Sequence, residues 1–135
     1  MDSEVGMILD EFESKGLMEN TVVFFVADNG RCDVRAKSYL YEPGTRVPMI
    51  VYGKGVKPAV VNDLVSELDL PASFLYLAGV EQPDYYQGRV LNALLPKRDK
   101  HAPYDYLYTA SDNFDDVIEC FRAVHDKRYT YIRNY

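Results

Sequence analysis

The chain has 135 residues, of which 47% are apolar and 27% are charged, and its formal net charge is −6. This length corresponds to one domain. Because acidic and basic residues are interspersed, the composition excludes the broad basic surface of a nucleic-acid-binding protein and a polybasic membrane-binding segment. No apolar run is long enough for a transmembrane helix, and the N-terminus has no signal-peptide pattern. We therefore expect neither a nucleic acid nor a membrane as a partner.

The first two predicted elements are a helix and a strand. Residues 2–15 carry apolar side chains at the spacing of one helical face, and we expect this helix to pack on a sheet. The apolar positions of that face are Val5, Ile8, Leu9 and Phe12. Residues 22–26, with the sequence VVFFV, are rich in β-branched and aromatic side chains and are too few for an ordinary helix. They predict a strand buried on both faces, as in a parallel or mixed α/β sheet.

A carboxylate and an amide follow this strand at Asp28 and Asn29, and Gly30 comes next. In open α/β sheets, ligands bind where strands give way to loops. Anionic and neutral oxygen atoms together suit a hard cation such as Ca²⁺ or Mg²⁺, with the remaining ligands coming from elsewhere. The alternative interpretation is a simple turn, because Asp, Asn and Gly all tolerate turn conformations.

The loop after this turn is basic and contains Arg35, Lys37 and Arg46. A metal-binding carboxylate followed by a basic loop suits an oxyanion such as sulfate or phosphate, because the metal and the cations share its negative charge. Each of these cations, taken alone, is more simply interpreted as a solvated surface charge.

The rest of the chain predicts short elements separated by an irregular stretch. Residues 49–52 predict a buried strand, and residues 66–78 predict a helix. Residues 80–103 are broken by several prolines, and we expect them to be irregular. Three strand-like segments follow, at 104–110, 117–125 and 129–135. A tight turn at residues 126–127 joins the last two into a hairpin.

The run Asp28-Asn29-Gly30, followed by Lys37 and then by residues 41–48 with the sequence YEPGTRVP, resembles the second half of the type I sulfatases. These enzymes belong to the alkaline-phosphatase-like superfamily. Their pattern is an apolar strand, Ser/Ala-Asp-His/Asn-Gly, a basic loop with a lysine, and Tyr-Glu/Asp-x-Gly-x-Arg-Val-Pro. The order and spacing of the residues here are similar.

The C-terminal segment carries a second resemblance. Residues 122–134 are similar to the small C-terminal domain of heparan N-sulfatase-like and arylsulfatase-like members, with His125 where arginine is usual. The resemblance implies an α/β fold, namely the C-terminal part of an alkaline-phosphatase-like mixed sheet flanked by helices and followed by a small antiparallel β-hairpin region. It divides the chain into the end of the main α/β domain (1–80), an irregular connection (81–103) and the start of the small antiparallel subdomain (104–135).

The resemblance also implies hydrolysis of a sulfate ester or sulfamate on a sulfated small molecule or glycan. Asp28 and Asn29 would be the cation ligands, with Ca²⁺ as the cofactor. Lys37 would be a catalytic residue that contacts the sulfate and the nucleophile. Arg46 would bind substrate or order the loop through Glu42 or Asp28. The parent enzyme would be periplasmic, secreted or lysosomal.

The nucleophile of the family is a formylglycine made from the first residue of Cys/Ser-x-Pro-x-Arg. Neither Cys32 nor Cys120 has that context. We therefore expect a C-terminal fragment of a sulfatase that has no turnover by itself and binds Ca²⁺ weakly. Surfaces that the other half of the enzyme would cover are expected to promote self-association.

Three alternatives stay open. A phosphohydrolase or phosphomutase of the same superfamily would use serine or threonine as nucleophile and further histidine ligands, and the scarcity of histidine argues against it. A non-enzymatic carbohydrate-binding or interaction module fits if the sequence is complete as written. A receiver-like α/β domain has a similar order of helix, strand and strand-end aspartate, but the terminal antiparallel strands do not fit it.

Overall fold

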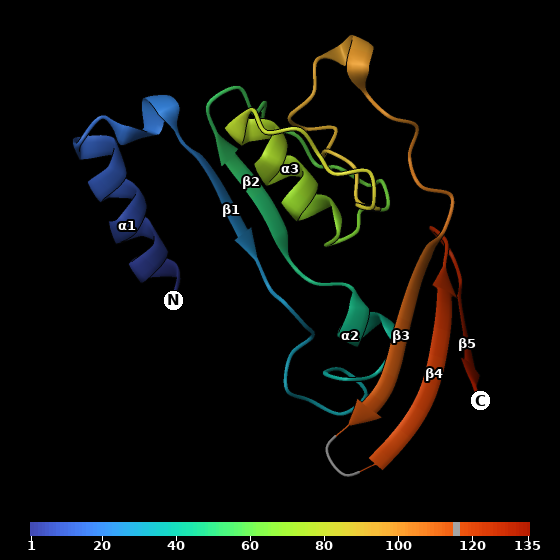
Figure 1. The fold of residues 1–135 in the computed structure, drawn as a ribbon. Helices are drawn as coiled ribbons and strands as arrows, with labels where there is room; N and C mark the ends of the chain where they lie inside the picture. The colour runs from blue at the N-terminus through green and yellow to red at the C-terminus, as the bar shows by residue number, and fades with distance from the viewer. Residues whose placement is uncertain (115–116) are drawn as a thin grey trace.

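The computed structural model describes residues 1–114 and 117–135, which form two antiparallel sheets together with helices (Figure 1). The α/β class predicted from the sequence is confirmed. The elements in chain order are α1 (Asp2–Ser14), the 3-10 helix η1 (Leu17–Asn20), β1 (Val22–Val26), α2 (Glu42–Thr45), β2 (Met49–Gly53), α3 (Asp69–Ala78), the 3-10 helix η2 (Lys97–Asp99), β3 (Leu107–Phe114), β4 (Val117–His125) and β5 (Thr130–Asn134).

The first sheet consists of β1 and β2, which pair antiparallel over their full length. α3 packs against this pair, where the rings of Phe24 and Phe74 meet edge to face with their centroids 4.9 Å apart. β1 is half-buried along most of its length and Val26 is exposed. The prediction of a strand buried on both faces is therefore wrong for this structure. With two strands in the sheet, its apolar side chains keep part of their surface in water.

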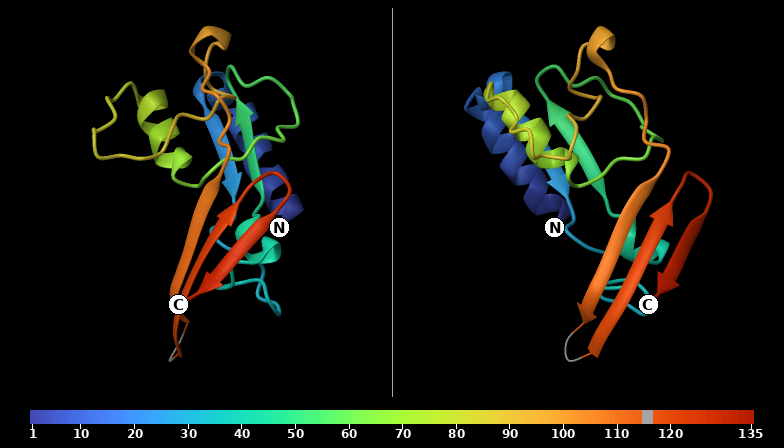
Figure 2. Two further views of the ribbon diagram at one scale, coloured as in Figure 1. Left: turned by 90° about the vertical axis from the view of Figure 1, so that its right-hand side faces the viewer. Right: turned by 45° about the vertical axis from the view of Figure 1, so that its right-hand side comes forward.

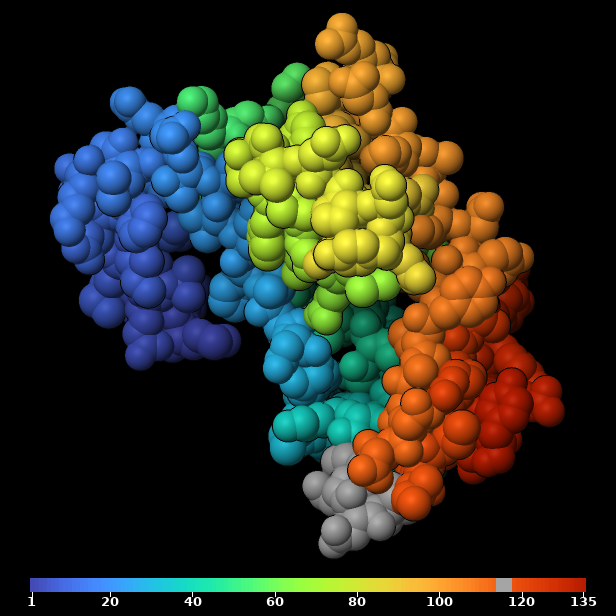
Figure 3. Space-filling model, viewed as in Figure 1, coloured from blue at the N-terminus to red at the C-terminus, as the bar shows by residue number. Residues whose placement is uncertain are grey.

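α1 has the predicted amphipathic pattern, but none of its residues is buried. Ile8, on the predicted apolar face, is 57% exposed. The helix stands on the far side of β1 from β2 in Figure 1, and Figure 3 shows it as a lobe set apart from the rest of the molecule in that view. The hydroxyl of Tyr52 in β2 donates a hydrogen bond to the Glu13 carboxylate (3.3 Å). The helix thus packs on the sheet less closely than its pattern predicted.

α3 ends at Ala78, and the next residue, Gly79, adopts the left-handed conformation (φ 68°) that favours glycine. The buried face of this helix is polar at two positions. Asp69 is 2% exposed and Ser73 is fully buried. Ser73 Oγ donates to the backbone oxygen of Asp69 (2.7 Å) and accepts from the backbone N–H of Leu91 (2.9 Å). These bonds attach the irregular segment after the helix to its buried face.

The second sheet has the order β3-β4-β5 with antiparallel neighbours, as predicted for the C-terminal region. The β4–β5 connection is longer than the predicted two-residue turn, because β4 ends at His125 and β5 begins at Thr130. The Asp126 carboxylate accepts hydrogen bonds from the backbone N–H groups of Arg128 (2.6 Å) and Tyr129. This side chain therefore satisfies backbone donors that strand pairing leaves open.

The two sheets meet through the chain segments between them. In the views of Figure 2, the loop between β1 and β2 lies beside one end of the second sheet, and the segment after α3 leads into the other end. Among the described residues, no helix is long and apolar enough to cross a membrane. The loop between β1 and β2 contains the residues that the sequence singled out.

Candidate functional site

Asp28 and Asn29 lie side by side just after β1 ends. The Asn29 side-chain nitrogen Nδ2 donates a hydrogen bond to Asp28 Oδ1 (2.6 Å). Asp28 is exposed and Asn29 is half-buried. Within the part of the chain that the structure describes, no hydrogen bond uses Oδ2 of Asp28 or Oδ1 of Asn29. One oxygen atom of each side chain is therefore available to a ligand.

Gly30 brings this pair against the segment before β2. It is buried, and its N–H donates to the backbone oxygen of Gly44 (3.2 Å). A Cβ atom at Gly30 would lie 2.2 Å from the backbone oxygen of Pro43, and one at Gly44 would lie 2.1 Å from that of Tyr39. Both glycines are needed for this close approach. The sequence indicated only a turn at Gly30, and the second glycine, in YEPGT, is the signal that could have revealed the pairing.

The basic loop is folded by its own backbone. The N–H of Lys37 donates to the backbone oxygen of Arg31 (3.1 Å), and Arg35 and Ser38 have positive φ values of 59° and 69°. The Lys37 side chain is exposed and forms no ion pair with any described residue. Its charge is therefore available to an anion, although no hydrogen bond or ion pair among the described residues joins it to Asp28.

Arg46 pairs with Glu42, which lies one helical turn earlier in α2. The guanidinium Nη1 and the carboxylate Oε1 are 2.8 Å apart, and the two side chains are 82% and 68% exposed. An ion pair with this exposure adds little stability. Of the two partners expected for Arg46, the structure shows Glu42.

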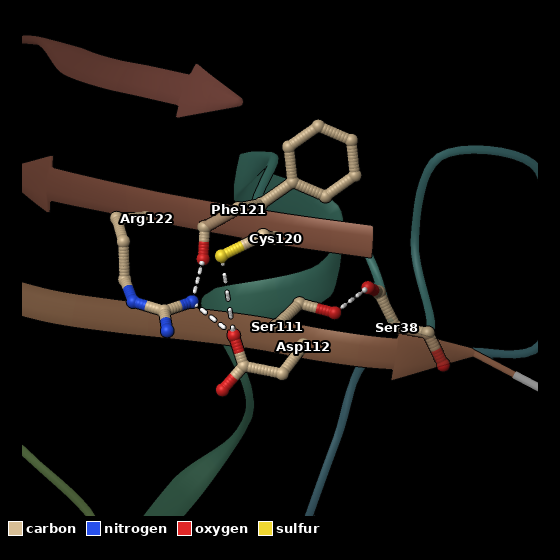
Figure 4. A network of polar contacts seen from close by, with 6 residues as sticks. All are labelled: Ser38, Ser111, Asp112, Cys120, Phe121 and Arg122. Carbon is tan, nitrogen blue, oxygen red and sulfur yellow. Dashed lines mark hydrogen bonds and ion pairs between the residues drawn. The ribbon is translucent and has the colours of Figure 1, made fainter. Parts of the chain in front are cut away.

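One end of the second sheet contacts the basic loop. Ser111 of β3 donates a hydrogen bond to the backbone oxygen of Ser38 (3.2 Å), beside the ion pair between Arg122 and Asp112 (Figure 4). Leu40, from the same loop, is buried. The loop that carries Lys37 is thus held between the end of β1 and the C-terminal sheet.

Glu67, in the turn before α3, lies within the electrostatic field of Asp28. Partial burial, and then the negative charge of Asp28, raise the pKa of the Glu67 carboxyl. The turn is fixed by Asp69, whose Oδ2 accepts a hydrogen bond from the backbone N–H of Ser66 (3.0 Å). The sequence pattern did not indicate this electrostatic influence, because it acts between segments that are distant in sequence.

The described residues contain no group of three or more His, Cys, Asp or Glu side chains that could hold a metal ion. Asp28 and Asn29 supply two hard oxygen donors, and this chemistry fits Ca²⁺. Two donors fall short of the six to eight oxygen atoms that calcium takes. The arrangement can therefore form part of a cation site next to a basic loop.

The chain is similar in sequence to known proteins. Residues 1–80 match the family model described as Sulfatase. The chain is 35% identical over its whole length to an ulvan-active sulfatase of Formosa agariphila, and it covers 22% of that protein.

Two solved structures are also similar. With the structure of a 2-O GAG sulfatase the TM-score is 0.73 at 27% identity, covering 86% of this chain and 27% of that one. With a protein in complex with its substrate D-glucosamine-2-N,6-O-disulfate, the TM-score is 0.78 at 24% identity, covering 99% of this chain and 29% of that one. The chain thus spans less than a third of each of these proteins.

Proposed function

This chain belongs to the sulfatase family, and from that premise we propose that it contributes part of the active site of an enzyme that hydrolyses sulfate esters or sulfamates. In this proposal Asp28 and Asn29 are ligands of Ca²⁺, and Lys37 contacts the sulfate and the nucleophile. Arg46 supports the loop that carries Lys37 and contributes to substrate binding.

The observation that carries the proposal is the pair of side chains after β1. The bond from Asn29 Nδ2 to Asp28 Oδ1 turns the amide nitrogen toward the carboxylate, which leaves Asn29 Oδ1 and Asp28 Oδ2 for a hard cation. The Gly30–Gly44 approach holds this pair at the base of the basic loop. A lone turn would not require two glycines in such close backbone contact.

The chemistry assigned to these residues is electrostatic. A bound Ca²⁺ would neutralise negative charge on the sulfate oxygens. Asp28 provides the anionic oxygen for that ion and Asn29 a neutral one. The Lys37 ammonium group, which has no ion-pair partner among the described residues, stabilises negative charge that develops on the sulfate as the ester bond breaks.

The nucleophile of the proposed reaction belongs to another segment of the enzyme. These 135 residues contain no Cys/Ser-x-Pro-x-Arg sequence from which a formylglycine could form. We therefore expect the purified chain to hydrolyse no sulfate ester by itself. Hydrolysis of an aryl sulfate by this chain would contradict that expectation.

A sulfated glycan is the substrate class that we favour. The support comes from relatives, one named for activity on ulvan and one structurally similar protein named as a 2-O GAG sulfatase. A small sulfated molecule is the alternative within the same reaction.

Isothermal titration of Ca²⁺ into the purified chain tests the metal assignment. Because two protein ligands supply less than a full shell, we expect a weak Kd on the order of 1 mM. Asp28→Ala should abolish this binding, and Asn29→Ala should weaken it. Asp84→Ala, which removes an exposed carboxylate far along the chain, is the matched control and should leave the titration unchanged. Equal binding by the wild type and Asp28→Ala would refute the assignment.

A further inference from the structure

A surface cleft of about 410 Å³ lies at the end of the second sheet, opposite the end that contacts the basic loop. It is formed by the segment that leads into β3 and by the β4–β5 loop. The lining residues are Tyr104, Asp105, Tyr106, Asp126, Lys127 and Arg128. The cleft is open to solvent along its outer side, so a ligand bound there would stay partly exposed. None of its residues belongs to the site proposed above.

Tyr104 fixes one wall of the cleft. Its hydroxyl donates a hydrogen bond to the buried Asp69 carboxylate (2.8 Å), and its ring lies beneath the guanidinium of Arg89, 3.4 Å from the ring centroid. Burial raises the pKa of the Tyr104 hydroxyl, so it stays a donor. Asp69 also accepts from the backbone N–H of Arg89 (2.9 Å). This wall is therefore held in place without a ligand.

The β4–β5 loop forms the other wall, and it is also anchored. Asp126 accepts two backbone hydrogen bonds within the loop, which lower the pKa of its carboxyl group. Lys127 forms a partly exposed ion pair with Asp63 in the segment before α3 (2.7 Å), which adds only a little to this hold. A cleft between two anchored walls needs little ordering when a ligand binds.

Three side chains in the cleft remain for a ligand. Tyr106 is 55% exposed. Among the described residues, Asp105 forms no hydrogen bond or ion pair, and Arg128 forms no ion pair. The Arg128 guanidinium lies over the ring of Tyr129, 5.0 Å from its centroid. Tyr108 in β3 is also exposed and lies two residues after Tyr106, so it extends the aromatic surface.

We propose that this cleft binds one pyranose unit of an anionic glycan. The Tyr106 ring stacks on the apolar face of the sugar, and Arg128 binds a sulfate or carboxylate group on it through two parallel hydrogen bonds. Asp105 accepts a hydrogen bond from a sugar hydroxyl. The choice of a glycan rests on the proposed function, but the cleft uses none of the residues of that site. A second point of contact would raise the affinity for a polymeric substrate.

NMR titration of the full chain tests the proposal, with a heparin tetrasaccharide and an uncharged dextran oligosaccharide as probes. Heparin should shift the amide signals of residues 104–106 and 126–129. Arg128→Ala should weaken heparin binding about tenfold, the loss expected for a charge-assisted hydrogen bond. Tyr106→Ala should weaken binding of both probes, and dextran should bind more weakly than heparin.

Matched variants outside the cleft separate this site from general charge attraction. Arg98→Ala and Tyr85→Ala remove an exposed arginine and an exposed tyrosine elsewhere and should leave binding unchanged. Asp28→Ala should lose Ca²⁺ binding and keep glycan binding, so the two proposals fail independently. Heparin shifts confined to the basic loop, an absence of shifts with both probes, or equal losses in Arg98→Ala and Arg128→Ala would overturn the cleft assignment.

Discussion

Gly30 has no room for a side chain. An alanine there would place a Cβ atom 2.2 Å from the backbone oxygen of Pro43. Backbone atoms cannot yield as a flexible side chain can, so the loop would have to move. We expect Gly30→Ala to lower the free energy of unfolding by about 1–3 kcal/mol or more, measured by urea denaturation.

Gly6 provides the control for that substitution. It lies within α1, and an added Cβ would meet nothing within 4 Å. Gly6→Ala should therefore raise stability by about 0.5–1 kcal/mol, because alanine loses less backbone entropy in a helix. If Gly30→Ala were as stable as the wild type, the close approach of Gly30 to Pro43 would be absent in solution.

His125 gives the second sheet a dependence on pH. Its ring nitrogens lie 2.7 Å from Thr109 Oγ1 and 3.0 Å from Thr130 Oγ1, so it links all three strands. Burial lowers the pKa of His125 below its ordinary value of 6.5. The unfolded chain then binds the proton more readily than the folded one. The stability from neutral His125 is complete above the unfolded pKa and is lost as pH falls through that value toward the folded pKa.

Thermal unfolding at several pH values between 7.5 and 5 measures this effect. The melting temperature of the wild type should fall as the pH is lowered through this window. His125→Gln keeps a polar side chain but cannot titrate, so its melting temperature should fall less over the same range. A parallel fall in both proteins would assign the effect to other groups.

At the scale of elements, Asp69 connects three of them. Its carboxylate accepts hydrogen bonds from Ser66 before α3, from Arg89 in the irregular segment and from Tyr104 before β3. Asp69→Asn preserves the size and shape of the side chain. It replaces one carboxylate oxygen with an NH₂ group, which then faces the hydrogen-bond donors that the oxygen accepted from. We expect a loss of about 2–4 kcal/mol in the free energy of unfolding, because charged hydrogen bonds are lost and a buried donor is left unsatisfied.

Urea denaturation followed by circular dichroism measures the Asp69 effect, with Asp99→Asn as the control at an exposed aspartate. The control should change stability by less than about 0.5 kcal/mol. Tyr104→Phe, which removes one of the three donors, should cost less than Asp69→Asn. Equal stability of Asp69→Asn and the wild type would mean that these elements are held together without this carboxylate.

At the scale of the whole molecule, apolar surface beside the first sheet is exposed to solvent. A groove of about 680 Å³ between β1 and α3 is lined in part by Phe74 and Leu77, which are 47% and 43% exposed. We expect the chain to self-associate through this groove, because an exposed apolar groove beside a two-stranded sheet favours a partner. Sedimentation velocity should show larger species as the concentration rises.

Leu77→Asp should shift the sedimentation profile of the chain toward monomer. Val60→Asp places the same charge at a valine that is 88% exposed and outside the groove, and should leave the profile unchanged. A wild-type profile that is monomeric at all concentrations would show that the groove stays open in solution.

The sequence by itself determined the local elements and the chemical identity of the candidate site. The pattern of each segment depends only on residues that are close together in the chain. The structure accordingly has a helix in residues 2–15 and strands at the VVFFV run and in the C-terminal segments. The donor atoms of Asp28 and Asn29 and the sulfatase pattern through YEPGTRVP are also properties of the sequence alone.

Only the tertiary structure decided which residues meet. The partial exposure of β1 depends on what packs against it. The approach of Gly30 to Gly44 and the cleft at Tyr106 join segments distant in sequence, and so does the effect of Asp28 on the pKa of Glu67. Periodicity and residue preference report which face of an element is apolar. They do not report what covers that face, because burial depends on how all the elements pack together.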